Sequence, residues 1–167
     1  MTSNCYIIDT SSLIELNKHN PMDVYPGVWQ KIEQLIKDGR LLAPKEVFHE
    51  IGNIDDQLHT WSKTQDKLFV EPTPKQIEIV KGILKKYPAL IDINRKYDAD
   101  PWVIALTIEL INSSQMTLFT IKRIVVTEEK LRGNQIKIPF VCQEYKIESL
   151  DIILTSPLDL FTTNKPP

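Results

Sequence analysis

The chain has 167 residues, of which 42% are hydrophobic and 25% charged, and its formal net charge is −2. This composition is enough to fill one core, and it excludes a protein that binds nucleic acid through bulk positive charge. No apolar run approaches the ~18 residues of a membrane span, and residues 1–4 lack the features of a signal peptide. Cys5 and Cys142 both lie in apolar runs, which indicates buried thiols in a reducing compartment. We therefore expect a cytoplasmic protein without membrane contact, with a single domain over residues 1–155 and a flexible tail over 156–167.

The first apolar run, residues 5–8, predicts a short buried strand that ends on Asp9. Hydroxyl side chains follow at 10–12, and apolar residues at helical spacing follow over 13–16. A strand that leads directly into a helix in this way places Asp9 at the carboxyl edge of a sheet, where open α/β sheets bind ligands. The alternative is that Asp9 only caps the helix, because Asp, Ser and Thr are all good N-caps.

The rest of the chain alternates between helices and short strands. Helices are predicted over residues 24–37, 44–51, 54–63, 75–87, 90–97, 102–110 and 143–154, and strands over 41–43, 68–70, 124–126 and 138–142. In the helix over 75–87, the predicted inward residues are Ile77, Val80, Ile83 and Leu84. This alternation indicates an α/β sandwich with a mainly parallel sheet.

Acidic side chains follow the same strand ends. Glu50 lies on the helix after the second strand, Asp100 begins an apolar helix, and Glu128 and Glu129 follow the strand that ends at Val126. Because these elements face one edge of a parallel sheet, we expect the acids to converge with Asp9. Converging carboxylates raise one another's pKa, and a divalent cation that activates water would remove that cost. Each acid also has an alternative explanation as a helix cap, a solvated face or a first-turn charge.

Four motifs, in this order over residues 4–142, resemble those of PIN-domain ribonucleases, the family of the VapC toxins. They are Asp9-Thr10-Ser11, Pro44-x-x-Val47-x-x-Glu50, Asp100 followed by Val103-Ile104-Ala105, and Val125-Val126-Thr127-x-Glu129. Lys137-Ile138-Pro139 through Tyr145 is similar to a bacterial PIN-like subgroup known as DUF4411. Glu129 departs from the family pattern, because most relatives have Asp at that position.

The resemblance implies a PIN-like fold, a three-layer α/β/α sandwich with a twisted sheet. It also implies an endoribonuclease that depends on Mg²⁺ or Mn²⁺ and hydrolyses RNA phosphodiester bonds, often a homodimer and commonly a toxin inhibited by a cognate antitoxin protein. The residues that it assigns are Asp9, Glu50, Asp100 and Glu129 as metal ligands and catalytic acids, with Ser11, Thr127 and Glu128 in support. The candidates for RNA phosphate are Lys45, Lys130 and Arg132, with Lys122, Arg123 and Lys137 as further basic residues that could contact it.

Two other functions fit parts of the pattern. Phosphatases related to haloacid dehalogenases also begin with a strand that ends on Asp, but they need a second Asp where this chain has Ser11. A PIN-like fold can also lose its chemistry and remain a binding or regulatory module, and the glutamate at position 129 keeps this second alternative open.

Overall fold

Five parallel strands form the centre of the protein in the order β3-β2-β1-β4-β5, in a computed structural model that describes residues 2–113 and 120–152. The strands are β1 (Thr2–Ile8), β2 (Leu41–Pro44), β3 (Phe69–Val70), β4 (Thr120–Val126) and β5 (Glu148–Leu150). Every neighbouring pair is parallel. The predicted parallel sheet is therefore confirmed.

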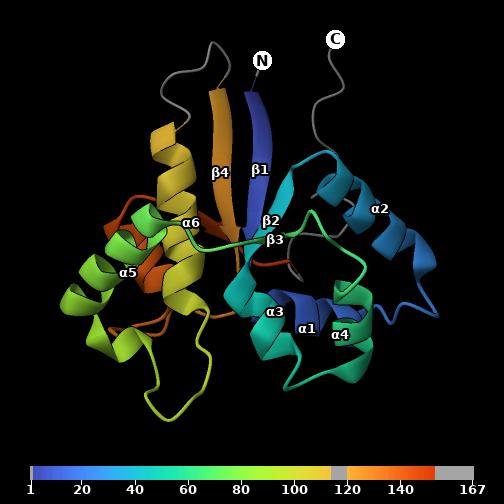
Figure 1. The fold of residues 1–167 in the computed structure, drawn as a ribbon, viewed down its shortest axis with the longest axis horizontal. Coiled ribbons are helices and arrows are strands. Elements are labelled where there is room, and N and C mark those ends of the chain that lie inside the picture. The colour runs from blue at the N-terminus through green and yellow to red at the C-terminus, as the bar shows by residue number, and fades with distance from the viewer. Residues whose placement is uncertain (1, 114–119, 153–167) are drawn as a thin grey trace.

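Helices cover both faces of this sheet. They are α1 (Thr10–His19), α2 (Pro26–Lys37), α3 (Lys45–Ile51), α4 (Asp56–Ser62), α5 (Pro74–Lys86), the 3₁₀ turn η1 (Pro88–Leu90), α6 (Asp100–Ser113) and α7 (Ile138–Glu144). Figure 1 shows α5 and α6 on one side of the strands and α2 on the other. The protein is thus the three-layer α/β/α sandwich that was expected. Within residues 2–113 and 120–152, no helix is both long and apolar enough to cross a membrane.

The core is centred on β1 and α6. Ile7 and Ile8 in β1 are completely buried, as expected for a parallel strand covered on both faces. Each contributes about 1.5–3 kcal/mol relative to an exposed side chain. On α6, residues 103–107 are all buried, and this helix packs against β1, β2 and β4. The packing of α6 against β1, β2 and β4 therefore fixes the position of the residues that follow these strands and of the start of α6.

The strand order reverses between β1 and β4. The chain first adds β2 and β3 on one side of β1, and then returns to place β4 and β5 on the other side. Ile8 pairs with Val126, and the backbone N–H of Asp9 donates to the carbonyl of Val126 at 3.0 Å. The residues that follow both strands therefore lie level with each other at a topological switch point, where open α/β sheets bind ligands.

The prediction of a strand over residues 138–142 is wrong, because this segment belongs to α7. Ile138, Val141 and Cys142 are fully buried at the i, i+3 and i+4 spacing of one helix face. Pro139 lies in the first turn, where the missing N–H of proline costs nothing.

Three further predictions need correction. The helix expected over 143–154 is wrong, because residues 143 and 144 end α7 and Glu148–Leu150 form β5. Residues 153 and 154, and the tail expected over 156–167, lie outside the described part of the chain. Residues 91–97 form a loop after η1 rather than a helix. Ile77 is 39% exposed, and Gln76 is buried in its place because its amide donates to Glu109 at 2.6 Å.

Candidate functional site

Asp9 is buried at the centre of the carboxyl edge. It caps α1, since its Oδ1 accepts from the Ser12 N–H at 2.8 Å, so the capping alternative is part of the geometry. The carboxylate also accepts from the Ser11 hydroxyl at 2.8 Å and from the Thr127 hydroxyl at 2.6 Å. Burial raises the pKa of Asp9 to about 6, although these donors oppose the rise. The side chain is therefore held by two strand ends, which is more than a helix cap requires.

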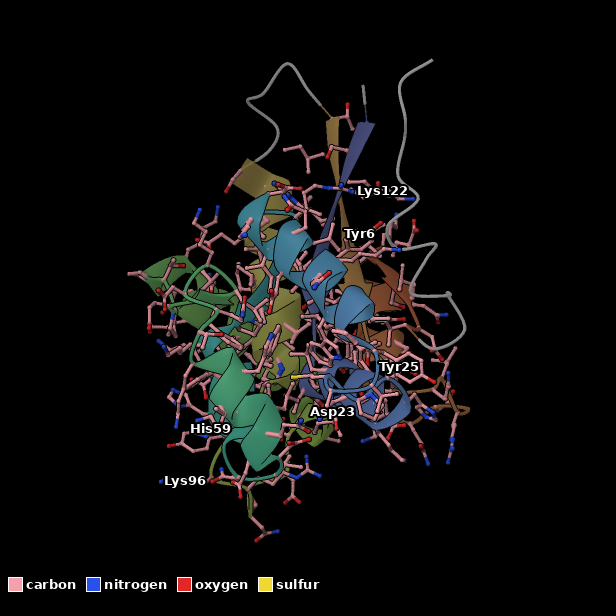
Figure 2. All side chains as sticks on the ribbon, turned by 90° about the vertical axis from the view of Figure 1, so that its right-hand side faces the viewer. Tyr6, Asp23, Tyr25, His59, Lys96 and Lys122 are labelled. Carbon is pink, nitrogen blue, oxygen red and sulfur yellow. The ribbon has the colours of Figure 1, made fainter. Side chains whose placement is uncertain are left out.

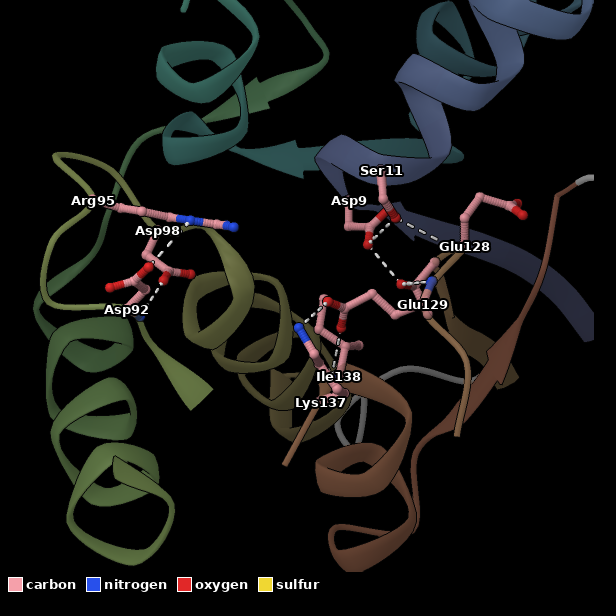
Figure 3. Close-up of polar contacts among 10 residues, drawn as sticks. Asp9, Ser11, Asp92, Arg95, Asp98, Glu128, Glu129, Lys137 and Ile138 are labelled. Carbon is pink, nitrogen blue, oxygen red and sulfur yellow. Dashed lines mark hydrogen bonds and ion pairs between the residues drawn. The ribbon is translucent and has the colours of Figure 1, made fainter. Parts of the chain in front are cut away.

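Two hydroxyl groups connect the loop after β4 to Asp9. The Ser11 Oγ accepts from the N–H of Glu128, and the Thr127 Oγ1 accepts from the N–H of Glu129, both at 3.1 Å. Figure 3 shows Ser11, Asp9 and the backbone of this loop joined in one hydrogen-bonded network. Each hydroxyl thus donates to a carboxylate and accepts from the backbone, which fixes the direction of the chain after Val126.

Glu50, near the end of α3, is bound to two other segments. The Thr10 hydroxyl donates to its Oε2, and the N–H of Ala99 donates to its Oε1 at 3.1 Å. Burial is the main cause that raises the pKa of Glu50, and the charge of Asp98 adds to it. Glu50 thereby ties α3 to the first turn of α1 and to the start of α6.

Asp100 lies where these charges meet. Burial raises its pKa well above the ordinary range, and negative charge adds to the rise from Glu129, Asp98, Asp9 and Glu50, in that order. At Asp9, hydrogen bonds favour the ionised carboxylate, whereas none of the influences on Asp100 favours its ionised form. Asp9, Glu50 and Glu129 are therefore close enough to Asp100 for their charges to act on it, and these four residues are here called the acidic cluster.

The two glutamates after β4 point in different directions. The Glu128 carboxylate accepts from the N–H of Ile152 at 2.7 Å, beyond the end of β5. The Glu129 carboxylate accepts from the N–H of Ile138 at 3.0 Å and forms an ion pair with Lys137 at 3.2 Å, as Figure 3 shows. Only Glu129 is among the charges that raise the pKa of Asp100. The geometry thus favours Glu129 over Glu128 as the fourth member of the cluster.

Comparison with protein families identifies the chain. A family model described as a domain of unknown function, DUF4411, matches residues 6–155. The chain belongs to the DUF4411 family. A comparison with curated proteins finds no match.

The acidic cluster of this DUF4411 chain is not arranged as a finished metal site. In the described part of the chain, no three His, Cys, Asp or Glu side chains are placed to hold one ion together. Asp9, Glu50 and Glu129 each accept hydrogen bonds from the protein itself. Carboxylate oxygens are the donors that Mg²⁺ prefers, and Asp100 brings a charge that its neighbours destabilise. These carboxylate ligands therefore suit a hard divalent cation chemically. Binding of the cation would replace some of their hydrogen bonds to the protein with bonds to the metal.

The basic residues proposed for RNA phosphate are spread around the DUF4411 domain. Lys45 pairs with Glu71 at 3.3 Å, Lys130 pairs with Asp151, and Arg132 lies on an exposed loop. Lys122 of β4 precedes the end of that strand by four residues, roughly 13 Å of extended chain. Figure 2 accordingly shows it far from Lys96, which lies at the opposite end of the molecule. No single basic patch is formed by these residues.

Three contacts near the acidic cluster were not predicted from the sequence. Thr10 donates to Glu50, Asp98 raises the pKa of Asp100, and Lys137 pairs with Glu129. The pair of acids at 98 and 100 was a usable signal, because two carboxylates separated by one residue lie at and just before the start of α6. Lys137 directly precedes α7, and the N–H of Ile138 in the first turn of that helix has no partner within the helix and donates to Glu129 instead, so the incorrect strand assignment hid these contacts.

Proposed function

We propose that this DUF4411 protein is a divalent-metal-dependent endoribonuclease of the PIN-domain kind. The observation that carries the proposal is the position of Asp100, whose pKa is raised by burial and by the other three acids of the cluster. These acids come from the ends of β1 and β4, from α3 and from the start of α6, and they meet where the strand order reverses. A set of acids at a ligand-binding edge calls for a compensating cation.

The residues would divide the work as follows. Asp9, Glu50, Asp100 and Glu129 would hold Mg²⁺ or Mn²⁺, which when bound supplies Lewis acidity for phosphodiester hydrolysis. Thr127 and Ser11 keep the Asp9 carboxylate in one orientation through hydrogen bonds of 2.6 and 2.8 Å. Restricting a ligand side chain in this way lowers the ordering cost of binding.

We also propose the biological role that the four motifs imply. The protein would act in the cytoplasm as a homodimeric toxin that a cognate antitoxin protein inhibits. The free, buried thiols of Cys5 and Cys142 support a reducing compartment.

A second candidate is a PIN-like binding module without catalysis. It is favoured by the contacts of Glu129, whose two carboxylate oxygens are already bound to Lys137 and to the N–H of Ile138. In that case Lys137 would serve as the permanent counter-charge of the cluster. The two functions differ in one observable property, which is RNA cleavage that depends on a divalent cation.

The test uses the purified chain with a labelled single-stranded RNA, in Mg²⁺, in Mn²⁺ and in EDTA. We expect cleavage by the wild type only with the cation, and almost none by Asp9→Asn, which keeps the side-chain shape and removes one charge. Asp23→Asn is the matched control, since Asp23 is exposed on the loop before α2. If Asp9→Asn cuts RNA as fast as Asp23→Asn, Asp9 acts as a helix cap alone. If the wild type does not cut, the binding module is the better account.

A further inference from the structure

A pocket opens directly beside the acidic cluster. It has a volume of about 360 Å³ and is lined by Glu50, Asn53, Ile54, Arg95, Lys96 and Tyr97. This volume falls in the range of small-ligand sites, roughly 300–1,000 Å³. One wall comes from the end of α3 and the turn after it, and the other from the loop over 91–98. Since Glu50 belongs to both the pocket and the acidic cluster, whatever fills the pocket lies next to that cluster.

The loop over 91–98 is held in shape by its own hydrogen bonds. The Asp92 carboxylate accepts from the backbone and side-chain amides of Asn94, both at 3.0 Å. The Asp98 carboxylate accepts from the N–H of Asp92 at 2.9 Å, and the N–H of Arg95 donates to the Asp92 carbonyl at 2.9 Å. These bonds close the loop across its base. Its outward side chains are therefore presented from a fixed backbone.

One aromatic ring, that of Tyr97, lines the pocket. Tyr97 stacks on His49, with ring centroids 4.9 Å apart and planes inclined by 19°. The Lys96 ammonium lies 5.2 Å from the centre of the Tyr97 ring. Ile54, from the turn after α3, also lines the pocket and is 62% exposed. A flat aromatic ring in the wall of an open pocket is the kind of surface on which nucleobases stack.

The pocket also concentrates positive charge in a chain whose net charge is −2. The Arg95 side chain is 65% exposed and forms a long ion pair of 3.9 Å with Asp92. Arg95 and Glu50 line the same pocket, so the guanidinium lies on the side of the pocket that meets the acidic cluster. Figure 3 shows the Arg95 side chain extending toward the side of the view that carries Asp9, with Asp98 beside it and hydrogen-bonded to Asp92. A phosphate bound by Arg95 would thus lie between the pocket and the acidic cluster.

We infer that this pocket, here called the nucleotide pocket, binds one unpaired nucleotide of an RNA strand, with its base against Tyr97 and its phosphate on Arg95. The inference rests on the proposed function, because it places a strand across the acidic cluster that would cut it. Asn53 supplies an exposed amide that can pair with a base edge. Paired bases cannot reach an aromatic wall in this way, since stacking on protein rings requires bases that have left the duplex.

The test measures RNA binding apart from cleavage. The probe is a fluorescein-labelled single-stranded RNA 12-mer, and the same sequence annealed to its complement gives the duplex. Fluorescence anisotropy is recorded in the Asp9→Asn background, where cutting is suppressed. We expect Tyr97→Ala to weaken single-strand binding about tenfold or more, Tyr97→Phe to restore it, and duplex binding to change little. Arg95→Ala should weaken binding and lower the salt dependence by about one phosphate contact.

Matched controls lie elsewhere on the surface. Tyr145→Ala removes an exposed ring that also has a lysine nearby, at the far end of α7, and Lys37→Ala removes one charge at the amino edge of the sheet. Circular dichroism confirms that each variant is folded, and Tyr97→Leu keeps an apolar side chain if Tyr97→Ala does not fold. If the Tyr97 and Arg95 variants bind single-stranded RNA as tightly as these controls, the inference is overturned.

The two proposals can fail separately. If the wild type cuts RNA and the Tyr97 and Arg95 variants keep its KM, the nuclease stands and the nucleotide pocket does not. If the wild type does not cut, but the Tyr97 and Arg95 variants lose single-strand binding, the pocket stands as the site of a binding module.

Discussion

At the carboxyl edge, Asp9 is buried and held by short hydrogen bonds, whereas in the nucleotide pocket Arg95 and Lys96 are exposed to solvent. Asp9 accepts from two hydroxyls and a backbone N–H. Arg95 by contrast makes one long, exposed ion pair. The first region fixes charges where the fold would otherwise exclude them, which suits chemistry on a bound phosphate. The second region holds its cationic side chains at the surface, where a strand can contact them.

The largest effects on activity are expected at the two glutamates after β4, which test whether the carboxyl edge is the catalytic region. We expect Glu129→Gln to lower metal-dependent RNA cleavage by about 10²–10³-fold, because one ligand charge is lost. Glu129→Asp should keep measurable activity, and Glu128→Gln should have the smallest effect, since that carboxylate is bound to the Ile152 N–H. Initial rates on one RNA decide the order. A larger loss in Glu128→Gln than in Glu129→Gln would make Glu128 the ligand.

The burial of Asp9 predicts a pH dependence of stability without metal. Its pKa is about 6 in the folded chain against an ordinary value of 3.8, so the folded state holds the proton more tightly. The contribution of Asp9 is therefore most favourable below pH 4 and is lost as the pH rises through about 6. The free energy of unfolding of the wild type, relative to Asp9→Asn, should fall by up to about 3 kcal/mol between pH 4 and 7.5.

Urea denaturation in EDTA at several pH values measures this difference. Asp23→Asn again serves as the exposed control, and its stability relative to the wild type should not follow the same curve. A constant difference between the wild type and Asp9→Asn over this range would mean that Asp9 ionises as easily in the folded chain as in the unfolded one.

Thr127 is the hydroxyl that joins the two strand ends. Thr127→Val keeps the shape but leaves the Asp9 carboxylate and the Glu129 N–H each without one partner. We expect a loss of about 1–3 kcal/mol in the free energy of unfolding, with most of it recovered in Thr127→Ser. Chemical denaturation of the three proteins provides the measurement. Equal stability of the Val and Ser variants would show that the hydroxyl is not what holds this edge.

Lys137 should give the smallest effect. Its side chain is 49% exposed, so loss of the pair with Glu129 should change stability by under about 1 kcal/mol. Lys137→Met removes a cation that competes for Glu129, and we expect Mn²⁺ to bind up to about fivefold more tightly. Isothermal titration calorimetry with Mn²⁺ measures whether binding becomes tighter or weaker. The control is Lys75→Met, which removes an exposed lysine on α5. Weaker Mn²⁺ binding in Lys137→Met would mean that Lys137 supports the site.

The sequence predicts the carboxyl edge well because its signals are local. Apolar runs that end on Asp9 and Thr127 predict strands, and parallel strands must bring those ends to one edge. The strand prediction over residues 138–142 was wrong because five residues that include a proline fit either an edge strand or a short helix. Only the burial of Ile138, Val141 and Cys142 on one face distinguishes them. β5 is three residues long and is defined by its pairing with β4, so its own sequence carries little signal.

The nucleotide pocket could not be predicted from the sequence. Arg95 and Tyr97 were placed in a helix over 90–97, whereas the loop that presents them is closed by contacts of Asp92 and Asp98. Such contacts depend on side chains that fold back on their own backbone, which periodicity does not register. His49 likewise supports Tyr97 across a distance of 48 positions in the chain.

The central claim is that the acidic cluster binds a divalent cation, and thermal unfolding of the wild type and Asp100→Asn tests it directly. In EDTA, Asp100→Asn should melt at a higher temperature, because the charge that its neighbours destabilise is gone. Mn²⁺ at about a hundred times its Kd should stabilise the wild type by about 2.7 kcal/mol and the variant far less. If Mn²⁺ raises the melting temperature of both proteins equally, or of neither, the acidic cluster is not a metal site.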